Sequence, residues 1–224
     1  MKRHKRLVQS KILNRSAHAD IFEIGVGGDA ANLYIFFGGS GIDESVYHER
    51  AESIMPLFDS SLLKLELRNV NAVLVFVTSP HDVSFERIAS DSAVAQQWEQ
   101  HVLDELCSQW QGHKFYLMAF SGGAALALNG LHRHPNCVGA AMFGADDFPT
   151  HWKGPEAWKH PVQLFCARDD RVCCAPVAMS RFKSLEKTGQ VEWIECASGG
   201  HSLKNYIDSF FLQAFYSAEA CFAK

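Results

Sequence analysis

The sequence predicts an α/β fold with a doubly wound, mostly parallel sheet and helices on both faces of that sheet. Two observations lead to this prediction: short apolar runs recur along the chain, and stretches with helical spacing alternate with them. Near-continuous apolar runs of strand length are typical of strands buried on both faces, as in a parallel sheet. The alternation of such strands with helices indicates right-handed crossover connections.

The first strand signal covers 20–26, which is expected to form an antiparallel partner at the start of the sheet. The overlapping stretch 25–30, Gly-Val-Gly-Gly-Asp-Ala, approximates a dinucleotide-binding fingerprint. That motif must open a helix, but the next apolar run begins at Leu33, so we expect a hairpin turn here and no bound cofactor. The apolar runs that predict buried strands lie at 33–37, 72–78, 115–120, 138–143, 162–167 and 191–196.

Between these runs, apolar residues recur at every third or fourth position, which favours amphipathic helices. The predicted helices cover 45–58, 90–110, 122–133, 176–187 and 203–222. The segment 60–71 is ambiguous, because its leucines at positions 62, 63, 65 and 67 fit either a short strand or a helical turn.

Length and composition indicate a globular protein with one hydrophobic core. The chain has 224 residues, of which 47% are hydrophobic and 21% charged. We expect a basic N-terminal segment over 1–19 and a single domain over 20–224. Six of the 21 Lys and Arg residues lie between Lys2 and Arg15, where the chain has no Asp or Glu. So short a cluster favours a solvated terminus over an arm for nucleic acid or membrane.

The remaining features give expectations about location and partners. No apolar run approaches the eighteen or so residues of a membrane span, and the basic start lacks the apolar core of a secretory signal. Seven cysteines without a C-x-x-C pair suit reduced thiols, so we expect a cytoplasmic protein without disulfides. No H-E-x-x-H or Walker-type motif predicts a metal or nucleotide site. A small-molecule substrate and a monomer or homodimer are expected.

The residues that follow the predicted strands are the candidates for chemistry, because ligands bind beyond the carboxyl ends of parallel strands. Ser121 follows the strand at 115–120 and stands directly before a glycine-rich helix start. This is the pattern of a nucleophile elbow, in which a sharp turn exposes the hydroxyl and directs the helix N-terminus at the oxyanion. Small residues such as Ala119 and Gly123 are needed on either side. The alternative is a tight glycine turn with an idle serine.

A base and an acid follow later strands of the same sheet. His201 lies in a glycine loop after the last strand, and an imidazole is well suited to act as a general base at neutral pH. Asp170 follows the preceding strand, where its carboxylate could hold the imidazole tautomer. Asp169 could take that place by one step of register, and Asp146 or Asp147 could reach it from the strand before.

The order Ser121, Asp170, His201 is the order found in α/β-hydrolases. The chain resembles that superfamily along nearly all its length. Its segment 120–126, Phe-Ser-Gly-Gly-Ala-Ala-Leu, resembles the elbow of the carboxylesterase, acyl-protein thioesterase and dienelactone hydrolase group. The segments 170–172, Asp-Arg-Val, and 200–202, Gly-His-Ser, resemble that group's acid and histidine segments. Dienelactone hydrolases proper use a Cys nucleophile, so Ser121 argues against that activity.

The resemblance also implies an oxyanion hole, in which the N–H of Gly122 is the first donor. The group usually has His-Gly after its third strand, whereas this chain has Gly38-Gly39-Ser40-Gly41. The second donor is therefore open between the N–H of Gly39 and that of Ser40.

These residues lead to an expected function: a serine carboxylesterase or thioesterase that cleaves small to medium substrates through an acyl-enzyme. The short stretch 144–161 stands where larger relatives insert a cap domain, so little or no cap is expected. Phe148, Trp152 and Trp158 in that stretch could form an aromatic rim for the substrate, or an ordinary packed loop. The alternative function is a catalytically silent protein of the same fold that binds a ligand or partner.

Overall fold

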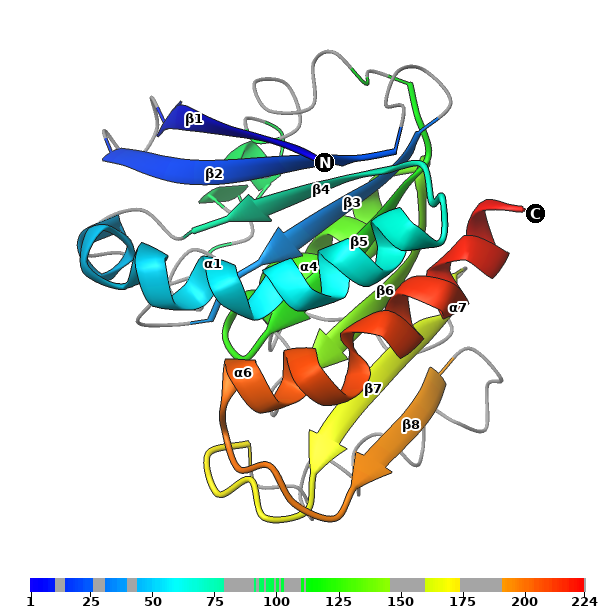
Figure 1. The fold of residues 1–224 in the computed structure, drawn as a ribbon. Helices are drawn as coiled ribbons and strands as arrows, with labels where there is room; N and C mark the ends of the chain where they lie inside the picture. The colour runs from blue at the N-terminus through cyan, green and yellow to red at the C-terminus, as the bar shows by residue number, and fades with distance from the viewer. Residues whose placement is uncertain are drawn as a thin grey trace.

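One eight-stranded sheet organises the structure, with the strand order β1-β2-β4-β3-β5-β6-β7-β8 (Figure 1). The strands from β4 across to β8 run parallel to one another, whereas β2 runs antiparallel to both of its neighbours. This computed structural model describes residues 1–10, 15–25, 31–39, 44–78, 91, 93–94, 96–98, 100, 102, 110, 112–145, 160–173 and 191–223. The predicted mostly parallel α/β sheet is confirmed.

The six predicted buried strands are present, each within one residue of its expected bounds. In three of them, β4, β5 and β7, every residue is buried, which explains their apolar runs, interrupted only by Gln163 in β7. The strands are β1 Lys2–Ser10, β2 Arg15–Ile24, β3 Asn32–Phe37, β4 Ala72–Val77, β5 Phe115–Phe120, β6 Cys137–Phe143, β7 Val162–Ala167 and β8 Val191–Cys196.

The basic start of the chain forms part of the sheet. Lys2–Ser10 form the edge strand β1, which pairs with β2 along its whole length. Charged side chains are common on edge strands, where they discourage pairing with a further strand, and this accounts for the basic sequence. The expected hairpin between the strand at 20–26 and the strand that follows it is wrong, because β4 lies between β2 and β3 in the sheet. Residues 26–30 themselves lie outside the described residues.

The helices resolve the ambiguous segment after residue 60. Helix α1 runs from Glu44 to Leu67, and within it Leu62 and Leu65 are buried while Leu63 and Leu67 are exposed, as helical spacing requires. The predicted C-terminal helix is present in three parts. The other helical elements are α4 Gly123–Arg133, α6 Leu203–Tyr206, a π-helical turn Ile207–Phe211 and α7 Leu212–Phe222. Within the predicted helix at 90–110, the described residues from 93 to 102 are helical. The predicted helix at 176–187 lies outside the described residues.

Helices cover both faces of the sheet (Figure 1), as predicted. Alternate residues of β5 point to opposite sides: Leu117 packs into the core beneath α4, whereas Met118 packs into the core beneath α1 and α7. Figure 1 shows α1 and the α6–α7 segment crossing one face, with α4 on the other. Within the described part of the chain, no helix combines the length and apolarity that a membrane span needs.

Candidate active site

Ser121 occupies the sharp turn that joins β5 to α4. Its backbone has a φ of +50°, which is uncommon for a residue other than glycine and is typical of strained functional turns. The Ser121 N–H donates to the Phe143 carbonyl over 2.9 Å, and the Ser121 carbonyl accepts from the Ala124 N–H over 2.9 Å. These two hydrogen bonds tie the turn to the end of β6 and to the first turn of α4.

The start of α4 lies against the end of β3, which explains the glycine two positions after the serine. A Cβ atom on Gly123 would lie 2.5 Å from the Gly38 carbonyl oxygen and 2.6 Å from that of Phe37. Such distances are too short for any side chain. The close approach also brings Gly39 beside Ser121, because a Cβ atom on Gly39 would lie 3.2 Å from the Ser121 Cβ.

The structure brings Ser121, His201 and Asp170 together at the carboxyl edge of the sheet. His201 Nε2 lies 2.9 Å from Ser121 Oγ, and His201 Nδ1 lies 2.8 Å from Asp170 Oδ2. A carboxylate can only accept hydrogen bonds, so Nδ1 carries the proton and Nε2 is free to accept the serine proton. The Asp170 side chain is fully buried, whereas that of His201 is 16% exposed and therefore accessible from outside.

The alternative acids are placed differently. The Asp169 carboxylate accepts from the Gly200 N–H over 2.8 Å, so it holds the loop that carries His201 and does not bond the imidazole. Asp146 and Asp147 lie outside the described residues. In this arrangement the carboxylate on His201 is that of Asp170.

Four hydrogen-bond donors converge on the Asp170 carboxylate. Oδ1 accepts from the N–H groups of Val172 and Cys173 over 3.0 and 2.9 Å, and Oδ2 accepts from Tyr206 over 2.9 Å and from His201. Burial raises the pKa of Asp170, but the hydrogen bonds from Cys173, His201 and Tyr206 outweigh burial and leave this pKa below its ordinary value. The carboxylate therefore stays ionised at neutral pH.

The loop that carries His201 is fixed at both of its glycines. The Gly199 carbonyl accepts from Asn205 Nδ2 over 2.5 Å, and the Gly200 N–H is bound by Asp169. Gly200 has a φ of +56°, a conformation that favours glycine and turns the chain so that the next residue faces the sheet edge. The His201 ring lies 4.9 Å from the ring of Phe120, the residue that precedes Ser121.

The predicted oxyanion donors and substrate residues are only partly visible. Gly122 is the N-cap of α4, and its N–H makes no hydrogen bond to any other described residue. Ser40, Phe148, Trp152 and Trp158 lie outside the described residues. The oxyanion role of Gly122 with Gly39 or Ser40, and the aromatic rim, stay predictions.

Sequence reasoning missed Tyr206, the residue that contacts Asp170 from the C-terminal helix. Its side chain is buried, and its hydroxyl lies between Asp170 Oδ2 and the Ala167 N–H, 2.9 Å from each. Burial raises the pKa of Tyr206, so the hydroxyl is neutral. The available signal was a tyrosine on the buried face of a helix, whose hydroxyl requires a polar partner.

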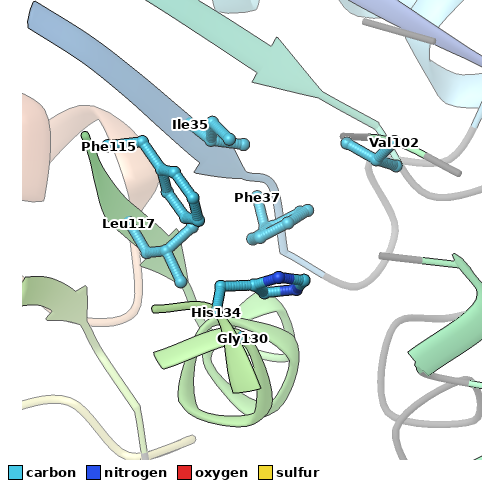
Figure 2. A pocket seen from close by; sticks show the side chains of 7 residues that line it. All are labelled: Ile35, Phe37, Val102, Phe115, Leu117, Gly130 and His134. Atoms are coloured by element: carbon cyan, nitrogen blue, oxygen red, sulfur yellow. The ribbon is translucent and has the colours of Figure 1, made fainter. Parts of the chain in front are cut away.

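A separate apolar pocket lies beneath α4, away from this site (Figure 2). Its lining combines strand residues of β3 and β5 with residues of two helical segments, and none of the candidate catalytic residues reaches it. The lining residues are Ile35, Phe37, Val102, Phe115, Leu117, Gly130 and His134. In the described ranges, no cluster of His, Cys, Asp or Glu side chains has the arrangement of a metal site.

No protein-family model and no curated protein sequence matches the chain, but solved structures do. An esterase from Thermogutta terrifontis, solved with bound butyrate, has a TM-score of 0.64 and 14% identity over 97% of this chain and 94% of its own. The esterase domain of a Rhodothermus marinus protein has a TM-score of 0.67 and 12% identity over 98% of each chain.

The enterobactin esterase of Shigella flexneri, solved in the presence of enterobactin, is a third similar structure. It has a TM-score of 0.72 and 15% identity, over 97% of this chain and 58% of its own, so this chain spans under two thirds of that enzyme's length. Identities this low show the fold alone. The chain has the α/β-hydrolase fold that its sequence motifs indicate.

Proposed function

We propose that the protein is a serine hydrolase that cleaves carboxylic ester or thioester bonds through an acyl-enzyme intermediate. The observation that carries this proposal is the continuous hydrogen-bonded chain from Asp170 through His201 to Ser121. Three features support it further. The backbone of Ser121 is strained, the N–H of Gly122 at the helix N-terminus bonds to no other described residue, and esterases are found among proteins of the same fold.

In the first half-reaction, Ser121 Oγ attacks the substrate carbonyl carbon while His201 Nε2 takes the hydroxyl proton. The carbonyl oxygen becomes an oxyanion, which accepts hydrogen bonds from the Gly122 N–H and from the N–H of Gly39 or Ser40. The intermediate then collapses: the bond to the leaving oxygen or sulfur breaks, and His201 gives its proton to the departing alcohol or thiol. Ser121 is left as an acyl ester.

Water completes the second half-reaction by the same steps. His201 removes a proton from water, the resulting hydroxide attacks the acyl carbon, and Ser121 leaves with the proton that His201 returns. Asp170 keeps its negative charge throughout, because its hydrogen bonds favour the ionised form. It fixes the tautomer of His201 and stabilises the imidazolium that forms in each step. As proposed, these steps need no metal or organic cofactor.

The proposed substrates are small to medium esters or thioesters, with Phe148, Trp152 and Trp158 forming the rim of the acyl site. Ester and thioester differ in the leaving group, and both suit the same base. A hydrolysis panel that varies acyl length in matched nitrophenyl esters and acyl thioesters measures this preference. We also propose a cytoplasmic protein that acts as a monomer or homodimer.

Labelling by a fluorophosphonate probe tests the proposed function directly. The wild-type protein should form a stable covalent adduct on Ser121, and Ser121→Ala should abolish it, with mass spectrometry of the labelled peptide as the readout. Ser202→Ala is a matched control, because it removes a nearby hydroxyl that is not bonded to His201 and should leave labelling intact. A folded wild type that neither reacts with the probe nor hydrolyses any member of the panel would identify a silent binding protein instead.

A further inference from the structure

Two side chains hold the carboxylate of Asp170, the proposed acid of the site. On one side it meets His201, and on the other it meets the first turn of the C-terminal helix, where Tyr206 follows His201 by five positions. The same carboxylate oxygen, Asp170 Oδ2, receives both His201 Nδ1 at 2.8 Å and the Tyr206 hydroxyl at 2.9 Å. Two donors therefore share the charge of one oxygen.

The direction of the tyrosine hydrogen bond follows from its second partner. The Ala167 N–H lies 2.9 Å from the Tyr206 oxygen, and a backbone N–H can only donate. The hydroxyl oxygen accepts that bond, which leaves its single proton for Asp170 Oδ2. Tyr206 thus links the last residue of β7 to the carboxylate three residues further along the chain.

We infer that Tyr206 is a positioning residue of the proposed hydrolase site, whose hydroxyl fixes Asp170 and sets where the acid limb of the pH–rate profile lies. The inference rests on the proposed function. Its physical basis is charge sharing, because a hydrogen bond donated to a carboxylate reduces the negative potential that a neighbouring imidazolium feels. Less stabilised imidazolium means that the base stays unprotonated to lower pH.

The ring of Tyr206 is held by other aromatic rings. Its centre lies 5.8 Å from that of Phe120, 6.4 Å from Phe143 and 6.1 Å from Phe210. A π-helical turn begins at the next residue, Ile207, and such turns are uncommon and frequent at functional sites. Aromatic packing therefore holds the ring in place in addition to the two hydrogen bonds of its hydroxyl.

Other ionisable groups surround this cluster, and the experiment must account for them. From β7 and the turn after it, the Cys166 and Cys173 thiols face each other with 3.7 Å between their sulfur atoms, and Asp169 holds the histidine loop. From β8, the charge of Glu195 acts on the Cys166 thiol, and the Cys196 thiol is itself acted on by the charge of Asp169. From the end of β6, Gly144 approaches Asp170 Oδ2 and brings no ionisable group. Of these groups, the Cys166 thiol interacts with the Tyr206 hydroxyl, so the experiment needs a background in which this thiol is absent.

The test is the pH dependence of kcat/KM for a nitrophenyl ester in Tyr206→Phe. Without the hydroxyl, the acid limb should move upward by roughly half a pH unit, and kcat should fall severalfold with KM nearly unchanged. Tyr216→Phe, on the neighbouring helix with a partly exposed ring, is the matched control and should keep the wild-type profile. The shift should persist in a Cys166→Ala background. A purely structural role would lower kcat/KM equally at every pH.

A second substitution probes the hydroxyl without removing it. Replacing Tyr206 by 3-fluorotyrosine keeps the ring and makes the phenol a stronger donor, so the acid limb should move downward, opposite to Tyr206→Phe. If Tyr206→Phe does not fold, the fluorotyrosine protein decides alone. Acid limbs that stay at the wild-type position would overturn the role of Tyr206, while Ser121-dependent probe labelling of the wild type would leave the proposed function standing. Absence of that labelling would reject the function itself.

Discussion

At the scale of single residues, the site depends on the close approach of α4 to the end of β3. Gly123→Ala would place a methyl group within 2.6 Å of two carbonyl oxygens, so the backbone must shift. We expect the free energy of unfolding in urea to fall by about 2 kcal/mol. We also expect slower probe labelling, because Ser121 moves with the turn.

Gly112→Ala provides the comparison for that experiment. Its added methyl meets no atom within 4 Å and suffers only the positive φ of +86°. It should cost about 1 kcal/mol and leave the labelling rate as in the wild type. Equal losses of stability in both variants, with labelling untouched in both, would show that the approach of α4 to β3 tolerates a side chain.

Asp170 also makes the stability of the protein depend on pH. Because its pKa in the folded protein lies below the ordinary value of 3.8, the ionised carboxylate stabilises the fold above that value, and this contribution is lost as the pH falls through the folded pKa. Asp170→Asn should therefore be less stable than wild type at neutral pH, and the difference should shrink below about pH 4. Urea midpoints measured from pH 7 to pH 3 give the comparison.

Asp208→Asn is the control for this pH dependence. Asp208 is an exposed carboxylate paired with Lys204 over 2.5 Å, and exposed pairs contribute little. This variant should follow the wild-type curve at every pH. A gap between Asp170→Asn and wild type that stays constant down to pH 3 would contradict the lowered pKa.

At the scale of elements, the edge strand β1 is joined to the sheet by a buried charge. Arg3 Nε lies 3.0 Å from Asp20 Oδ1, and the Asp20 side chain is fully buried while that of Arg3 is 37% exposed. The guanidinium also lies 5.4 Å from the centre of the Phe22 ring. The pair therefore fixes the register of β1 on β2 through one charged contact.

Arg3→Met should leave the Asp20 carboxylate buried without its counter-charge and lower the free energy of unfolding by about 2 kcal/mol. The double variant Arg3→Met with Asp20→Asn should recover part of that loss, because the buried charge is gone. Lys2→Met, one position away and exposed, should change stability by less than about 0.5 kcal/mol. A double variant that is no more stable than Arg3→Met would show that the charge is not the cause.

Some strands and helices could be predicted from the sequence, and others could not. The parallel strands could be predicted because a strand buried on both faces must be apolar at every position, as β4 is. Strand β1 could not, since its sequence is basic, as suits an edge position, and lacks the apolar run that marks a buried strand. The helix over 60–67 was hidden because leucines at 63, 65 and 67 imitate the alternation of a strand, although the observed burial follows helical spacing.

At the scale of the whole molecule, the sheet determined what could be inferred about the site. Ser121, Asp170 and His201 could be grouped because each follows a strand, and parallel strands end at one edge. Tyr206 could not be grouped with them, since it lies within a helix and meets a carboxylate 36 residues earlier in the chain. A residue that directly follows a strand can be identified from the sequence as a candidate reacting group. The residues that position such groups are brought to them by packing between helix and sheet, which the sequence does not show.

The strands that carry the three side chains are spread across the later half of the chain, with β6 inserted between β5 and β7. Ser121 and His201 are separated by 80 residues along the chain, and β6, β7 and β8 must join the sheet before Nε2 meets Oγ. Contacts of such long separation form late, because closing the loop costs entropy before the contact stabilises anything. A chain leaving the ribosome or returning from denaturant therefore acquires its proposed chemistry only when the last strand docks, and no nascent portion can act as a hydrolase before then.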